Sequence, residues 1–168
     1  PPEVLENSGM TYSKRFNRLY LVNDSGNDNF FYVTDLKGKL LEKVLVKRAV
    51  NVDWEAITYA PCGMSFCLFI GDIGDNGEDT KTHHIYIITE LKNFNKAAAL
   101  RTDITFTYDD GLPHNAESIA VHPISGDIYI ASKNLVAAPT IIYKIAKSTF
   151  LNRAKATVVA KKVGEINY

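Results

Sequence analysis

The amino-acid sequence predicts an all-β fold, a β-propeller made of three four-stranded blades. Two observations lead to this prediction. Short runs rich in Val, Ile, Tyr and Thr alternate with turn-forming Gly, Asn and Asp residues, a pattern typical of strands joined by tight turns. The same series of runs also occurs three times, at intervals of about 47 to 62 residues, as repeated blades do. The repeat places the blades at approximately residues 6–50, 51–111 and 112–168.

Four strands are expected in each blade, in the same order along the chain. The expected first strands are 8–12, 55–59 and 117–121, the second 19–24, 68–72 and 128–133, the third 31–34, 85–88 and 142–145, and the fourth 40–46, 104–108 and 156–160. Turn-forming pairs such as Asn76-Gly77 and Asp110-Gly111 separate several of these runs. The best helical segment is 93–100, which would give only about two turns. A β-sandwich has a similar number of strands, but its strands need not resemble one another, so the repeat favours the propeller.

Three blades do not close a ring, because propellers typically have about 4 to 8 blades. An open set of blades would expose flat apolar faces, and exposed faces of this kind usually serve as interfaces. We therefore expect the ring to be completed by a second chain, a second copy of this chain or missing sequence. Two copies would form a ring around a two-fold axis.

Charge and hydropathy exclude two classes of partner. The 168-residue chain has 19 Lys and Arg residues against 19 Asp and Glu residues, and its pI is near 7.3. Nucleic-acid binders usually carry a basic stripe and a high pI, so no nucleic-acid partner is expected. No apolar run approaches the roughly 20 residues that a membrane-spanning helix needs, so no membrane insertion is expected.

The two cysteines bear on the compartment. Cys62 and Cys67 are separated by four residues that include a glycine, which fits a tight hairpin whose ends a disulfide would bridge. Two buried thiols are the alternative. A disulfide would imply an exported protein, and the chain begins with Pro1 instead of an initiator Met. These features lead us to expect an extracellular or periplasmic protein.

Acidic and amide side chains recur at equivalent positions of the repeat. Glu55 and Glu117 align with each other, and we also align Asp24 with Asp72. Equivalent positions of neighbouring blades converge on the propeller axis, so these carboxylates should lie close together and repel one another unless a cation offsets their charge. Oxygen ligands without sulfur favour Ca²⁺ over Mg²⁺. The predicted metal ligands are therefore Glu55, Asp72, Asn115, Glu117 and Asp24.

The remaining residues of the predicted ligand face are Asp53, Trp54, Asp75, Asn76 and His114. His114 would shift the choice of ion toward a transition metal. Each residue also has a simpler interpretation. Asp and Asn are common in tight loops for conformational reasons, and the only Trp is more often a packing residue than a ligand contact.

Three segments, 53–57 (DWEAI), 71–76 (GDIGDN) and 114–119 (HNAESI), resemble the recurring motifs of a largely uncharacterised propeller family. The turn at 125–127 (SGD) stands where that family has a TGD-type turn. The resemblance covers most of the chain and implies a propeller fold without a defined activity. Family members are usually longer, which favours a truncated or split chain here.

A looser similarity, in residue type and place, exists to calcium-dependent propeller lactonases and related hydrolases. Those enzymes hold an ion at the channel mouth with Glu, Asn and Asp, and Glu55, Asn115 and Glu117 would play that part here. Two functions therefore stay open. The first is a binding module whose cation site supports a face for a protein or a glycan. The alternative is a metal-dependent hydrolase of an ester or lactone, with Asp72 as the base.

Overall fold

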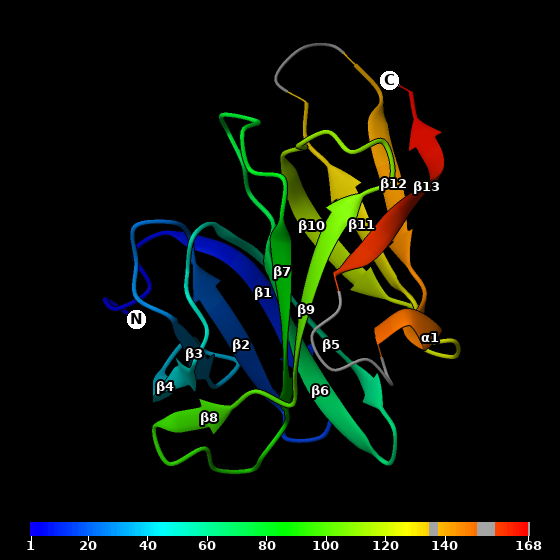
Figure 1. The fold of residues 1–168 in the computed structure, drawn as a ribbon. Coiled ribbons are helices and arrows are strands. Elements are labelled where there is room, and N and C mark those ends of the chain that lie inside the picture. Colours follow the sequence, from blue (N-terminus) through cyan, green and yellow to red (C-terminus); the bar gives the residue numbers. More distant parts are fainter. Residues whose placement is uncertain (135–137, 151–156, 168) are drawn as a thin grey trace.

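The computed structural model describes residues 1–134, 138–150 and 157–167. In this part of the chain the regular structure is almost entirely β-strand, with one short helix, α1 (Lys147–Phe150) (Figure 1). The all-β class predicted from the sequence is confirmed. The strands are β1 (Asn7–Ser13), β2 (Arg18–Asn23), β3 (Phe30–Thr34), β4 (Leu40–Lys47), β5 (Trp54–Cys62), β6 (Ser65–Asp72), β7 (His83–Thr89), β8 (Ala97–Ala99), β9 (Thr102–Tyr108), β10 (Ala116–Val121), β11 (Ile128–Ser132), β12 (Thr140–Ile145) and β13 (Val158–Ile166).

Three antiparallel meanders follow one another along the chain. They are β1-β2-β3-β4, β5-β6-β7-β9 and β10-β11-β12-β13. Each strand expected from the sequence overlaps a strand of this series, and Ala156, expected in the last strand, lies outside the described residues. The alternation of apolar runs with turn residues therefore located the strands of the three meanders correctly.

Two parallel pairings complete two sheets. β4 pairs with β8, which gives a five-stranded sheet of order β1-β2-β3-β4-β8. β13 pairs with β9, which gives an eight-stranded sheet of order β10-β11-β12-β13-β9-β7-β6-β5. The two end strands of that order, β10 and β5, lie against each other, so the sheet is nearly closed and barrel-like (Figure 1). Neither parallel pairing was predicted.

The segment expected to be helical, 93–100, contains strand β8 instead. Asn95 and Lys96 adopt φ values of 54° and 67°, in the left-handed region, which ends any helical path before the alanines. Ala97 then pairs with Leu45 of β4. Alanine has a high helix propensity, but pairing along an otherwise free strand edge outweighs it here.

The middle meander is buried on both faces. On β6, Cys67 and Phe69 belong to a core inside the eight-stranded sheet, whereas Leu68 and Ile70 belong to a core shared with the five-stranded sheet. β7 alternates in the same way. Successive strand residues point to opposite faces, so a strand covered on both sides must be apolar throughout. This explains the continuous apolar runs at 66–70 and 85–88.

Cys62 and Cys67 form a disulfide that closes the β5–β6 hairpin, with a Cα–Cα distance of 5.7 Å. Of the two alternatives that the sequence left open, the disulfide is therefore the one observed. Among the described residues, no helix has the length and apolar character needed to cross a membrane.

Candidate functional site

A β-bulge occurs at the same place in the first strand of every meander. The register shifts between Asn7 and Gly9 in β1, between Trp54 and Ala56 in β5, and between Ala116 and Ser118 in β10. The unpaired residues at these bulges are Ser8, Glu55 and Glu117. Bulges re-aim side chains, and they are common beside functional sites. The equivalence of Glu55 and Glu117 read from the sequence is thus a shared backbone feature, with Ser8 as its third member.

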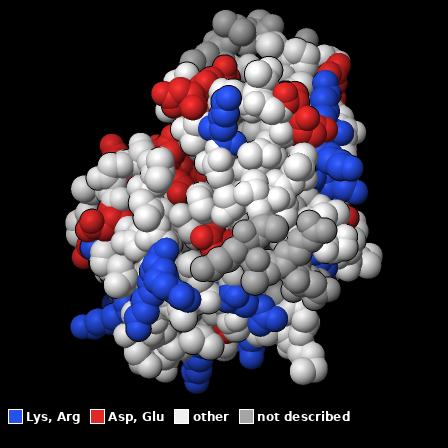
Figure 2. Space-filling model, in the orientation of Figure 1, with Lys and Arg blue, Asp and Glu red and all other residues white. Residues whose placement is uncertain are grey.

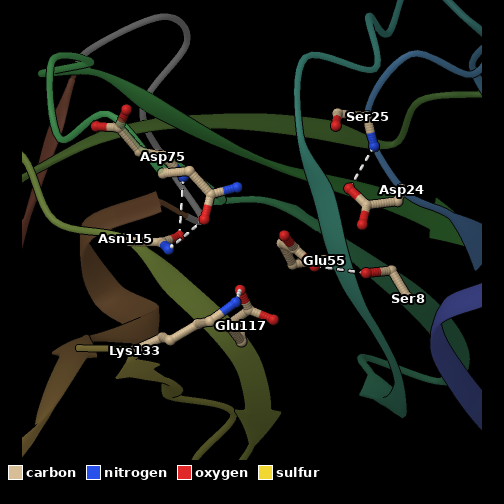
Figure 3. Close-up of polar contacts among 9 residues, drawn as sticks. Ser8, Asp24, Ser25, Glu55, Asp75, Asn115, Glu117 and Lys133 are labelled. Atoms are coloured by element: carbon tan, nitrogen blue, oxygen red, sulfur yellow. Dashed lines mark hydrogen bonds and ion pairs between the residues drawn. The ribbon is translucent and has the colours of Figure 1, made fainter. Parts of the chain in front are cut away.

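Three carboxylates meet beside the bulge of β5. One ligand oxygen from each of Asp24, Asp53 and Glu55 lies within 4.8 Å of the other two. We call these three residues the acidic cluster. Asp24 follows the end of β2, while Asp53 and Glu55 flank Trp54 at the start of β5. Figure 3 shows Asp24 and Glu55 turned toward the same space, with Glu117 nearby.

Glu55 is the most buried residue of the acidic cluster, with only 5% of its surface exposed. The Ser8 hydroxyl donates a hydrogen bond of 2.5 Å to Oε2 (Figure 3). Burial raises the pKa of Glu55 to about 7, and the charges of Glu117, Asp24 and Asp53 add to the rise. The hydrogen bond from Ser8 lowers the pKa of Glu55, but by less than burial raises it.

One oxygen of the Asp53 carboxylate is unpaired. Its Oδ1 atom is buried and has no hydrogen-bond partner among the described residues. Burial and the adjacent Asp24 raise the pKa of Asp53 to about 6. The backbone holds the residue firmly, because its carbonyl oxygen accepts the N–H groups of Ile73 and Gly74 at 3.1 Å each. Leaving a buried carboxylate oxygen unpaired costs free energy, which a bound cation would offset.

Strand register corrects the alignment of Asp24 with Asp72. Asn23 pairs with Asn7 and Asp72 pairs with Trp54, so Asn23 and Asp72 are the equivalent residues. A shift of one residue changes the face to which a strand side chain points. Asp24 therefore joins the acidic cluster, and Asp72 does not.

Asp72 stabilises the entry to β5 instead. Its Oδ1 accepts the backbone N–H groups of Asp53 at 2.6 Å and Val52 at 3.2 Å, and its Oδ2 accepts the hydroxyl of Tyr86 at 3.4 Å. The residue is 5% exposed, and burial raises its pKa. Its carboxylate is thus committed to fixing the backbone that carries Asp53.

Asn115, Asp75 and Asn76 join two loops. The side-chain Oδ1 of Asn115 accepts the Asp75 backbone N–H at 2.9 Å, and the side-chain Nδ2 donates to Asn76 Oδ1 at 3.1 Å (Figure 3). The Asp75 carboxylate accepts the N–H groups of Asp79 and Thr80. These amide and carboxylate groups, predicted as ligands, therefore hold the β6–β7 loop against the start of β10.

Glu117 has a cationic partner. Lys133 Nζ lies 2.7 Å from Glu117 Oε1, and both side chains are partly exposed (Figure 3). The pKa of Lys133 is raised by Glu117 first, and also by the charges of Glu55 and Asp24. Lys133 was not predicted as a site residue. It directly follows Ser132, the β11 residue paired with Ala116 at the bulge, and so holds the place that Asp24 holds in the first meander.

The two ring residues predicted on the ligand face lie elsewhere. Trp54 is fully buried, packs 5.9 Å from the Tyr86 ring, and donates its indole N–H to the carbonyl of Val50 at 2.9 Å. Trp54 is therefore a packing residue. His114 Nε2 lies 2.7 Å from Asp110 Oδ2, and the ring packs against Tyr108. His114 is thus engaged outside the acidic cluster.

No known protein family and no curated protein sequence match this chain. Among solved structures, hydrazine synthase from Kuenenia stuttgartiensis is similar, with a TM-score of 0.52 and 9% sequence identity. The match covers 95% of this chain and 36% of that chain, so the present chain spans well under half of the protein that it matches. At this level of identity the likeness concerns the fold alone.

Proposed function

We propose that this chain is a binding module whose acidic cluster holds a divalent cation, with Ca²⁺ as the first choice. The observation that carries the proposal is the buried, unpartnered Oδ1 of Asp53 within a group of three carboxylates whose ligand atoms lie within 4.8 Å of one another. A cation would complete the bonding of that oxygen and offset the mutual repulsion of the group.

The ligand chemistry supports a hard cation. Asp24, Asp53 and Glu55 offer only oxygen atoms, and the disulfide removes both cysteines from consideration. Ca²⁺ accepts irregular sets of six to eight oxygens and uses water to complete them, whereas Mg²⁺ demands near-octahedral geometry. Three carboxylates from two separate segments fit the irregular coordination of Ca²⁺ better than the octahedral coordination of Mg²⁺.

The hydrolase alternative has less support. It requires Asp72 as a base, but the carboxylate of Asp72 accepts two backbone N–H groups and the residue is 5% exposed. A general base must reach the proton that it abstracts. We therefore favour binding over catalysis.

Terbium luminescence and calorimetric titration with Ca²⁺ test the cation site. Asp53→Asn keeps the shape of the side chain and removes its charge, so we expect at least a tenfold loss of affinity. Asp28→Asn is the matched control, because Asp28 is exposed and lies outside the cluster. Equal affinities for the wild type and Asp53→Asn, or no binding by either, would refute the proposal.

The loops that carry the acidic cluster would form the binding face for a protein or a glycan. A glycan array and a pull-down, each run in Ca²⁺ and in EDTA, test this part of the proposal. Binding that depends on Ca²⁺ and is lost in Asp53→Asn supports it. Partners captured equally well in EDTA count against it.

We further propose that the three meanders are blades of a β-propeller, completed by a second copy or a second chain, in an oxidising compartment outside the cytoplasm. Support comes from the contacts of β5 with both β1 and β10, which bring the three first strands together. The disulfide supports the compartment. Native mass spectrometry decides the assembly: a dimer or a complex supports a completed ring, and a monomer at all concentrations argues against it.

A further inference from the structure

A cavity lies at the end of the molecule remote from the acidic cluster. It has a volume of about 150 Å³ and is lined by residues of the β5–β6 hairpin, the start of β9 and helix α1. The acidic cluster adjoins Trp54, where β5 begins, and the cavity adjoins Cys62, where β5 ends. Nine residues of strand separate the two places by roughly 25 Å. The cavity is therefore independent of the proposed cation site.

The cavity walls are apolar. Pro61, Phe69, Ile87, Phe150 and the disulfide-bonded Cys62 line it. Phe69 and Ile87 belong to the core inside the eight-stranded sheet and are 4% and 3% exposed. The floor is thus part of a rigid, packed core, which keeps the cavity preformed. An apolar cavity of this volume suits a single benzene-sized ring.

Two cations complete the lining, Arg101 and Lys147. Among the described residues, neither side chain has a hydrogen-bond or ion-pair partner. Arg101 is exposed, and its Nη2 would lie 3.9 Å from a Cβ atom added at Gly63. The aliphatic part of Lys147 covers Gly126, while Asp127 accepts the Lys147 backbone N–H at 2.9 Å. Both cations therefore border the cavity, and neither charge is paired with another described residue.

The surface around this end favours anions. Figure 2 shows that the lower end of the face in view carries mostly Lys and Arg, whereas Asp and Glu gather higher up. A single-sign patch raises the local concentration of ions of the opposite sign. A ligand suited to this end therefore combines an apolar body with a negative group.

We propose that this cavity binds a small aromatic carboxylate of about the size of benzoate. The ring fills the apolar cavity, and the carboxylate accepts hydrogen bonds from Arg101 and Lys147. Guanidinium and carboxylate form strong charge-assisted pairs. An inorganic anion would leave the apolar walls exposed to water, and a long acyl chain exceeds the volume, so neither chemistry fits the whole cavity.

The test is a titration with sodium benzoate, followed by NMR of the ¹³C-labelled Ile87 methyl group. A ligand with so few atoms should bind with a dissociation constant on the order of 1 mM. We expect the Ile87 signal to shift on titration. Benzamide, which has the same shape and no charge, should bind at least about tenfold more weakly.

Charge-removing variants locate the carboxylate. Arg101→Gln and Lys147→Gln should each weaken benzoate binding by about tenfold or more, whereas Lys37→Gln, an exposed control, should leave it unchanged. Asp53→Asn should not affect it, which separates this site from the acidic cluster. If the Ile87 signal does not shift at benzoate concentrations up to about ten times the expected dissociation constant, the proposed site is wrong. Equal binding of benzamide, or wild-type affinity in both variants, overturns the assignment of an anion.

Discussion

Gly74 lies directly against the carboxylate of Asp53. A Cβ atom at Gly74 would stand 2.3 Å from Asp53 Oδ2 and 2.9 Å from the Cγ of Glu55. The φ angle of Gly74 is not in the left-handed region, so the backbone does not demand glycine there. The requirement is space. Two members of the acidic cluster are positioned by the absence of a side chain at this residue.

Gly74→Ala should therefore displace Asp53 and weaken cation binding. We expect a loss of affinity of at least about tenfold, with a loss of stability of about 1–3 kcal/mol from overpacking. Gly77→Ala is the matched control, because a Cβ there meets only Asp79 at an ordinary 3.6 Å. Calcium calorimetry and urea unfolding measure the two effects. Unchanged affinity in Gly74→Ala would show that the packing against Asp53 does not position the ligand.

The acidic cluster should make stability fall as pH rises when no cation is bound. The pKa of Glu55 is raised from 4.5 to about 7, so the folded state holds a proton that the unfolded state has released across that window. The unfolding free energy therefore decreases from about pH 4.5 to 7. The glutamine of the Glu55→Gln variant does not titrate, so this variant does not lose stability in this way. Urea unfolding in EDTA should show the variant gaining stability relative to the wild type up to pH 7 and not beyond.

Cation binding should show the opposite pH dependence. Protons compete with the cation for the same oxygens, so affinity should rise with pH until Glu55 and Asp53 are both ionised, above about pH 7. Calorimetric titrations between pH 5 and 8 measure this. An affinity that does not change with pH would show that these carboxylates do not bind the ion.

Local patterns predicted the strands well because strand identity depends on short-range chemistry. The parallel pairing of β8 with β4 was missed because it joins Ala97–Ala99 to a strand about fifty residues earlier, and no pattern within either segment encodes it. The alanines at 97–99 indicated a helix for the same reason. Propensity describes a segment alone, whereas the free edge of β4 decides its conformation.

The site was predicted in part. Glu55 and Asp24 were expected together, and they do meet, but Asp53 was assigned only to the surrounding face. Alternation along β5 already contained the signal, because residues two apart share a face and Trp54 must then point to the core. Ser8 also occupies the repeat position of Glu55 and Glu117. The position of Asp72 outside the acidic cluster could not be predicted from the sequence, because it depends on a register difference of one residue.

A second buried carboxylate, Glu90, ties the first meander to the second. It is 2% exposed and accepts hydrogen bonds from Ser13 Oγ at 2.5 Å, Tyr20 OH at 2.7 Å and Tyr59 OH at 3.1 Å. Tyr20 OH also accepts the Nε–H of Arg18 at 2.8 Å. In contrast to Asp53, this carboxylate has its partners supplied by the chain itself.

Tyr20→Phe should destabilise the fold by about 1–3 kcal/mol, because it removes a hydroxyl that pairs Arg18 with Glu90 in a buried site. Tyr12→Phe is the control, since Tyr12 OH bonds to Asn17 in an exposed position. That change should stay within about 0.5 kcal/mol. Urea unfolding measures both. Similar losses in the two variants would mean that the Glu90 network contributes no more than a surface contact.

Gly9 controls the approach of β1 to β5, and with it the contact from Ser8 to Glu55. A Cβ at Gly9 would lie 2.7 Å from the backbone nitrogen of Ile57 and 2.9 Å from the Cα of Ala56. Backbone atoms cannot move aside as a flexible side chain can, so β1 must shift away from β5.

Gly9→Ala should therefore cost about 1–3 kcal/mol or more in urea unfolding. Gly164→Ala, in β13, is the control, because no atom lies within 4 Å of a Cβ there. The intact Ser8–Glu55 hydrogen bond holds the pKa of Glu55 down, and the shift of β1 should lengthen that bond. Losing that bond should raise the pKa further. NMR titration of the ¹³C-labelled Glu55 carboxylate follows this change, and an unaltered titration in Gly9→Ala would show that β1 does not position Ser8.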